Sequence, residues 1–156
     1  MISLTACGFQ LRGFDSDQEK MPVSIIVTGV QTGHPIIQRI NSLSYLSGDY
    51  SVEKKDEFQL LILNENWEKK VIRVNRMGQA QEYELRYSVL YEIFNAEKKR
   101  IKQPAEITIV RSYLNDVNNA LAISREEEAL KLVMINEFVE RFFRLMSVIS
   151  KNEIKT

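Results

Sequence analysis

The sequence is poor in the residues that build disulfides, metal centres and catalytic triads. It has one cysteine and one histidine, so an intrachain disulfide framework and a C-x-x-C site are excluded. A Ser-His-Asp or Cys-His site would have to use His34, which lies between Gly33 and Pro35 and is better interpreted as an exposed turn or helix-start residue. The motifs GxGxxG, GxxxxGK[ST], HExxH and GxSxG are all missing. We therefore predict a protein that is not an enzyme and that has no metal site.

The chain also lacks a charge excess and a long apolar run. Its 21 basic and 21 acidic side chains cancel, which argues against a general nucleic-acid binder, because such a protein needs a basic surplus. No apolar run approaches the roughly 18 to 20 residues of a membrane-spanning helix. Apolar residues make up 44% and charged residues 27% of the 156 residues, which is typical of one globular domain.

The first part of the chain predicts a linker, a strand and a helix. Residues 14–22 are polar and read as a linker, whereas residues 23–27 are mostly apolar and β-branched, as in a short buried strand. Pro35 suits the first turn of a helix, and Gly48 suits its stop. One apolar stripe at helical spacing lies between them: Ile36, Ile37, Ile40, Leu43 and Leu46.

The middle of the chain predicts a β-meander. Residues 58–63 and 71–74 read as one long or broken strand, followed by a turn at 75–78. Residues 83–93 alternate between apolar and mostly charged side chains, so this strand has one face on a core and one in a polar setting. After a charged loop, another strand is expected around residues 105–113.

A long helix is expected at the end. Ser124 and Glu127 have the S-x-x-E spacing of a capping box, which predicts the start of this helix. Two apolar rows follow, and together they make a face wider than a normal amphipathic stripe. The rows are Leu130, Val133, Phe138, Phe142, Leu145 and Ile149, and Leu132, Ile135, Val139, Phe143 and Met146.

This order of elements predicts an α+β two-layer sandwich, with two helices packed on one face of a four-stranded, mostly antiparallel sheet. We expect the single domain to span residues 23–150, with a short tail at 151–156. Residues 7–22 would be an N-terminal anchor and linker, and residues 1–6 the remnant of a lipoprotein signal peptide.

Cys7 is the first candidate for a functional residue. Residues 4–7 read LTAC, which has the form of a lipobox: an aliphatic residue, two small residues and then cysteine. Small residues let a signal peptidase cut before a cysteine whose thiol carries diacylglycerol, and the freed amine then takes a further acyl chain. A chance cysteine near a terminus is the alternative, because the pattern is loose and residues 1–6 are too few for a working leader.

Basic residues form the second candidate. Arg73 and Arg76 flank the expected turn, and Arg111 and Arg125 lie near the entry to the last helix. Guanidinium groups bind phosphates in bidentate geometry, so such a cluster could hold an anionic glycolipid, although a single surface arginine is usually only solvated. The charged run at 97–102 is better explained as a hairpin tip than as a binding patch.

Several segments resemble one family in the same order along the chain. Residues 7–13, CGFQLRG, resemble the mature N-terminus of the LptE family of LPS-assembly lipoproteins, which begins C-G-F-x-L-R-G with a lipidated cysteine. Residues 76–83, RMGQAQEY, resemble its hairpin turn, R-x-G-x-x-x-E-Y. Residues 111–113, residues 120–122 and Glu126 resemble its last strand and the entry to its final helix.

The resemblance implies an outer-membrane lipoprotein that faces the periplasm of Gram-negative bacteria. Members have two helices on a small sheet, plug the large β-barrel LptD, help it to assemble, and take part in delivering lipopolysaccharide to the outer leaflet. A lipid-anchored protein of this kind would carry N-acyl and S-diacylglycerol groups on Cys7 and need no other cofactor. A periplasmic lipoprotein that binds a small or lipidic ligand is the alternative function.

The resemblance also implies lipopolysaccharide contacts through basic residues. Arg76 matches the family's position in the hairpin turn, and Arg73 is its neighbour. The second position departs from the family, because Ile123 follows residues 120–122 where a lysine is common. Arg125 lies two positions further on and is the expected substitute. The candidate lipopolysaccharide-binding residues are therefore Arg76, Arg73 and Arg125.

Overall fold

The computed structural model describes residues 24–46, 57–115 and 119–153. They form β1 (Ser24–Thr28), α1 (Pro35–Leu46), β2 (Glu57–Val74), β3 (Ala80–Phe94), β4 (Arg100–Leu114) and α2 (Ala120–Glu153). The expected signal-peptide remnant, anchor and linker lie outside these residues, as does Gly48. The helix α2 includes residues 151–153 of the expected tail.

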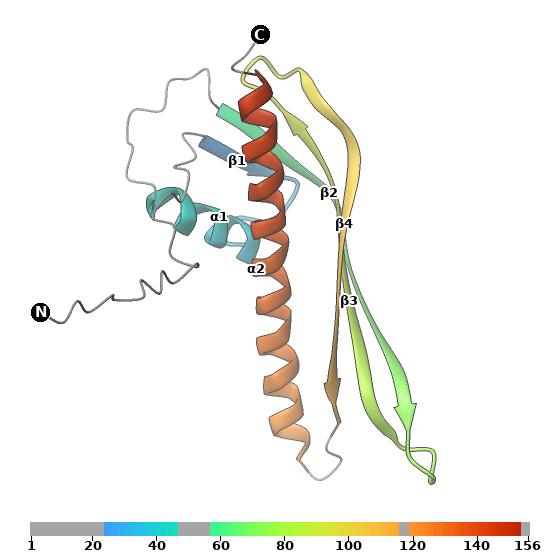
Figure 1. Cartoon of the computed structure of the whole chain (residues 1–156). Helices are drawn as coiled ribbons and strands as arrows, with labels where there is room; N and C mark the ends of the chain where they lie inside the picture. Colours follow the sequence, from blue (N-terminus) through green and yellow to red (C-terminus); the bar gives the residue numbers. More distant parts are fainter. Residues whose placement is uncertain (1–23, 47–56, 116–118, 154–156) are drawn as a thin grey trace, which may run out of the picture.

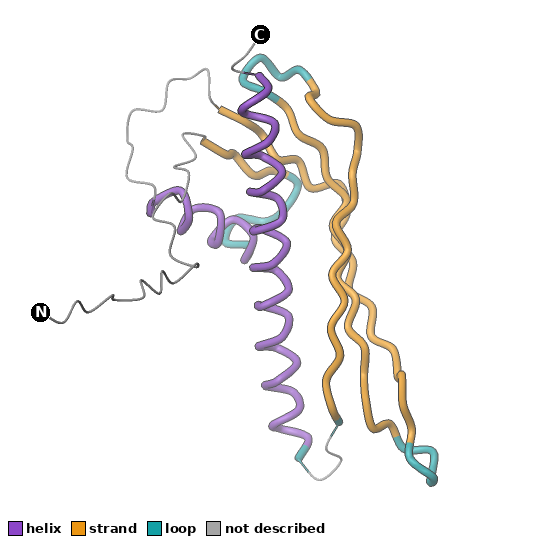
Figure 2. Tube along the Cα trace, viewed as in Figure 1, coloured by secondary structure: helices purple, strands orange, loops and turns teal. Residues whose placement is uncertain are grey.

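The four strands form one sheet in the order β1-β2-β3-β4. β1 is parallel to β2, and the other neighbours are antiparallel. The parallel pair needs a crossover connection, which α1 supplies. Figures 1 and 2 show both helices on one side of the sheet, with α2 running along most of its length. The predicted α+β architecture is confirmed.

β2 is one continuous strand of 18 residues, with register irregularities between Ile62 and Asn64 and on both sides of Arg73. Residues 57–61 pair with β1, and β2 pairs with β3 from Gln59 to Val74. The register places Trp67 opposite Tyr87 and Lys69 opposite Leu85, so these side chains face the helices. The polar stretch between the two apolar segments therefore belongs to the strand.

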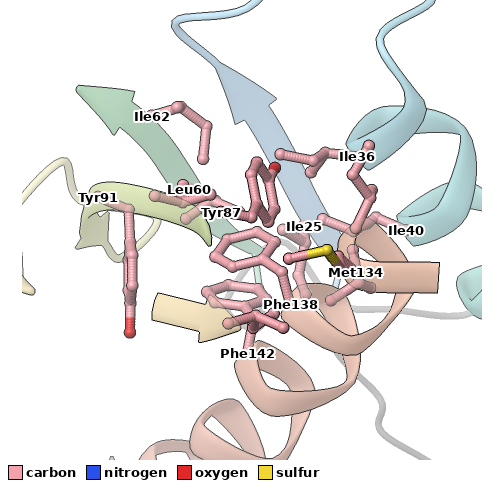
Figure 3. Close-up of a cluster of buried hydrophobic side chains, with 14 of the residues drawn as sticks. Ile25, Ile36, Ile40, Leu60, Ile62, Tyr87, Tyr91, Met134, Phe138 and Phe142 are labelled. Carbon is pink, nitrogen blue, oxygen red and sulfur yellow. The ribbon is translucent and has the colours of Figure 1, made fainter. Parts of the chain in front are cut away.

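The core lies between β3 and α2, with α1 closing one side. The rings of Tyr87 and Tyr91 form T-shaped pairs with the Phe138 ring, at centroid distances of 6.3 and 6.1 Å. Phe142 lies 6.4 Å from Phe138 and 5.9 Å from Tyr91. Figure 3 shows these rings together with isoleucine side chains from α1. The alternation over residues 83–93 therefore predicted the buried face of β3 correctly.

The predicted start of the last helix is wrong. α2 begins at Ala120, and Asn119 caps it: the backbone N–H of Ala122 donates to Asn119 Oδ1 at 3.2 Å. Ser124 therefore lies inside the helix. The side chain of Glu127 binds residues of the sheet, so it does not form the capping box.

The apolar face of α2 also differs from the prediction at its centre. Leu132 and Val133 are exposed, whereas Met134 is fully buried. Buried positions then recur at Phe138 and Phe142, which is the spacing of one helix face. The helix therefore faces the core with Met134, while Leu132 and Val133 lie on its exposed side.

Candidate functional site

The β2–β3 turn presents two side chains at one end of the molecule. The side chain of Asn75 holds the turn, because its Oδ1 accepts the backbone N–H groups of Met77 and Gln79, both at 2.9 Å. Gly78 has a φ of 78°, which a glycine adopts without strain. The side chains of Arg76 and Met77 are exposed to solvent. Figure 1 shows this turn at the same end of the molecule as the start of α2.

The predicted arginines differ in their ion pairs. Arg73 Nε lies 3.5 Å from Glu82 Oε2, so its charge is partly balanced across the strands. Arg76 has no ion pair among the described residues. Arg76 is therefore the residue of the hairpin that can take an anion without breaking an existing pair.

The start of α2 provides a second exposed arginine. Ile123 is partly buried and packs against the hydrophobic core. Arg125 is exposed and, within the described part of the chain, forms no ion pair. It lies near the start of α2, which Figure 1 shows at the same end of the molecule as the β2–β3 turn that carries Arg76.

Arg111 does not belong to this group. Its Nη2 forms an ion pair with Glu137 Oε2 on α2, and Arg141 Nη2 binds the other carboxylate oxygen at 2.7 Å. Arg141 also donates to the backbone oxygen of Thr108 on β4 at 3.3 Å. These bonds hold α2 against β4, so the role of Arg111 is structural.

The structure reveals a polar cluster that the sequence prediction missed. Glu127 Oε2 accepts a hydrogen bond from Lys69 Nζ at 2.6 Å and from the Tyr113 hydroxyl at 2.7 Å. Lys131 Nζ lies 2.9 Å from Oε1 of the same carboxylate. Lys69 also lies over the ring of Tyr83, 4.2 Å from its centroid. Lys69 and Val71 are two residues apart in one strand, so they share a face of the sheet. This spacing could have indicated that Lys69 faces the helix.

These contacts change the acidity of Glu127. The hydrogen bonds from Lys69 and Tyr113, and then that from Lys131, lower the pKa of this carboxyl from 4.5 to about 2. The ionised form is thus stabilised in the folded state. This carboxylate links the first half of α2 to β2 and β4.

Replacing Glu127 with glutamine is expected to lower the free energy of unfolding by about 1 to 2 kcal/mol near neutral pH, since solvent partly screens the carboxylate. Because the folded pKa lies below the unfolded one, this contribution is present above about pH 4.5 and disappears as the pH falls toward about 2. Urea unfolding of both proteins should give a difference that shrinks by more than half at about pH 3. The exposed Glu128→Gln variant is the control, and an equal difference at both pH values would contradict the assignment.

His34 serves as a helix-start residue, as predicted, although it is only partly exposed. Its Nδ1 accepts the backbone N–H of Ile36 in the first turn of α1 at 3.3 Å. Its Nε2 lies 3.0 Å from Glu65 Oε2, and Glu65 Oε1 accepts the Tyr87 hydroxyl at 2.8 Å. These bonds tie α1 to the centre of the sheet.

Three further expectations concern metal binding, membrane-spanning helices and the lipid anchor. In residues 24–46, 57–115 and 119–153, no group of three or more His, Cys, Asp or Glu side chains could hold a metal ion. No helix within the same ranges has the length and apolarity needed to cross a membrane. Cys7 lies outside the described residues, so its lipid attachment stays a prediction.

The face of the sheet opposite the helices is mostly polar along the middle of β3, although the exposed Val110 lies opposite Arg86 on it. Alternation along β3 places Glu84, Arg86 and Ser88 there, because Tyr87 points to the core. Arg86 lies 3.7 Å from Glu68 and 3.4 Å from Glu84, and the hydroxyl of Ser88 is 2.9 Å from that of Thr108. The charges on this face are thus largely balanced by their neighbours.

Solved structures of lipoproteins share this fold. Rare lipoprotein B from Shewanella oneidensis is 24% identical, with a TM-score of 0.66 over 83% of this chain and 96% of that one. Uncharacterized lipoprotein B from Nitrosomonas europaea is 22% identical, with a TM-score of 0.65 over 93% and 94%. A minor lipoprotein from Acinetobacter baumannii is 19% identical, with a TM-score of 0.60 over 81% and 90%.

The sequence comparison assigns the family. No curated protein matches the chain. The family described as LptE, lipopolysaccharide-assembly, matches residues 27–146. This range contains the whole of α1, β2, β3 and β4, the last two residues of β1 and most of α2. The chain therefore belongs to the LptE family of lipopolysaccharide-assembly proteins.

Proposed function

We propose that this chain is a lipid-anchored, non-enzymatic component of the outer-membrane lipopolysaccharide translocon. It plugs the LptD β-barrel, helps that barrel to assemble, and takes part in delivering lipopolysaccharide to the outer leaflet. The family match over residues 27–146 carries the proposal. Cys7 is its anchor, with N-acyl and S-diacylglycerol groups that hold the protein on the periplasmic side of the outer membrane.

The polar sheet face supports the position inside a barrel. The lumen of a large outer-membrane barrel is polar, so a plug needs a surface of hydrogen-bonding and charged groups. The face carrying Glu84, Arg86 and Ser88 meets this need, since it presents charged groups and hydroxyl groups that can hydrogen-bond to a polar wall. The alternative function, a ligand held between sheet and helices, has less support because packed aromatic side chains fill that layer.

Purification of the native protein tests this function. We expect a tagged full-length protein, extracted with detergent from outer membranes, to co-purify with a large β-barrel, and its N-terminal peptide to carry the mass of the acyl groups on Cys7. A Cys7→Ser variant should lose that mass, and cells with the untagged protein are the control. Recovery without any barrel would refute the plug, and an unmodified Cys7 in the native protein would refute the anchor.

The lipopolysaccharide contact has its own test. Arg76 is exposed and unpaired in the described structure, so we assign the main phosphate contact to it, with Arg73 and Arg125 as neighbours. Replacing Arg76 with aspartate should weaken lipopolysaccharide binding by about tenfold, since a charged hydrogen bond is lost and a repulsion is added. The loss should be smaller at high salt, because mobile ions screen the charges.

A binding titration at two ionic strengths measures this effect. Arg144→Asp is the matched control, because it makes the same charge change at an exposed position toward the C-terminal end of α2. Equal affinities of the Arg76→Asp variant and the wild type would remove Arg76 from the site. Equal losses in both variants would show that only the net charge matters.

A further inference from the structure

Exposed apolar side chains gather at the end of the molecule that carries Arg76. Half of the exposed large apolar side chains of the described residues lie at this end, although they come from three different elements and the turn. Met77, in the turn, has 80% of its surface exposed. We call this set the apolar tip: Val71, Ile72, Val74, Met77, Leu114 and Leu121.

The apolar tip surrounds the end of the sheet instead of covering one face of it. Val71 lies opposite Tyr83, on the face that carries α2, whereas Leu114 lies opposite Glu82, on the other face. Met77 lies in the turn, beyond the last residue pair of β2 and β3, and is exposed. An occupant of the apolar tip therefore has to contact it from both faces and from the turn. Acyl chains packed around an inserted tip would cover all of them.

The charges next to the apolar tip indicate what kind of lipid it meets. Arg73 lies in the same cross-strand row as Glu82 and Leu114, and Arg76 is adjacent to Met77 in the chain. Cationic side chains beside an apolar end suit an amphiphile whose phosphates lie at the edge of its acyl chains. The geometry points to the acyl chains of a phosphorylated glycolipid as the occupant of the apolar tip, with phosphates on the arginines.

This inference rests on the proposed function, because it takes lipopolysaccharide as the ligand and adds the part of the site that its acyl chains contact. The two contacts predict different responses to acylation. Deacylated lipopolysaccharide keeps the phosphates that would bind Arg76, but it lacks the acyl chains that would contact Val74 and Met77. The contribution of the apolar tip should then vanish, whereas that of Arg76 should remain.

Binding is measured for intact lipopolysaccharide and for the same glycolipid deacylated by alkali with its phosphates kept. The double variant Val74→Thr, Met77→Gln should lose about tenfold in affinity for the intact form, as expected when buried apolar surface is made polar. It should bind the deacylated form as the wild type does, whereas Arg76→Asp should weaken both. Val148→Thr, at an exposed apolar position near the other end of α2, is the control.

Each outcome decides one assignment. Wild-type affinity of the double variant for intact lipopolysaccharide, with an unchanged urea midpoint, would overturn the apolar tip and leave the proposed function standing. No binding of either glycolipid by the wild type would refute the lipopolysaccharide contact itself. An equal loss on phosphatidylglycerol vesicles would overturn the glycolipid as occupant, since it would show that any anionic lipid surface suffices.

Discussion

Replacing Gly29 with alanine is expected to cost about 3 kcal/mol or more of the free energy of unfolding. Gly29 follows β1 and has a φ of 88°, a conformation that strains residues with a side chain. An added Cβ would lie 2.1 Å from the backbone oxygen of Ile62, much closer than van der Waals contact allows. Because that oxygen belongs to the backbone of β2, the clash can be relieved only by moving a strand.

Gly33 provides a matched control, because it has the same φ of 88° but an added Cβ would meet no atom within 4 Å. Gly33→Ala should therefore cost only the backbone strain, about 1 to 2 kcal/mol. Urea unfolding followed by the fluorescence of Trp67 measures both variants. Equal losses for the two would show that the close approach of Gly29 to Ile62 contributes nothing.

Replacing Phe138 with alanine should have an effect of similar size, about 3 to 5 kcal/mol. The ring is fully buried and contacts Tyr87 and Tyr91 of β3 as well as Phe142 of α2. Its removal leaves a cavity in the layer that joins helix and sheet, and it also removes three aromatic contacts. Thermal or urea unfolding should show the loss without a change in the secondary structure of the folded state.

Leu132→Ala is the control for this variant. The apolar spacing predicts Leu132 on the buried face of the same helix, but the side chain is exposed, so its truncation should cost less than about 1 kcal/mol. A loss equal to that of Phe138→Ala would place Leu132 in the core and would contradict the observed face of α2.

Local patterns predicted most of the secondary structure. The alternation over residues 83–93 predicted β3, and the apolar spacing after Pro35 predicted α1, because both depend on the period of one element. The start of α2 was missed because local patterns do not distinguish its possible caps. Asn119 and Ser124 are both acceptable caps from the local sequence. In the structure Asn119 makes the capping bond, and the side chain of Glu127 binds Lys69 and Tyr113 of the sheet instead of the helix start.

The sequence by itself determined the α+β class, the family and the position of Arg76 in the hairpin turn, because each depends on short segments of the chain. Only the tertiary structure decided which arginines are available to a ligand. Arg73 meets Glu82 across two strands, and Arg111 meets Glu137 of α2, so both depend on strand register and helix rotation. Arg76 stays unpaired among the described residues because the turn carries it past the last strand pair.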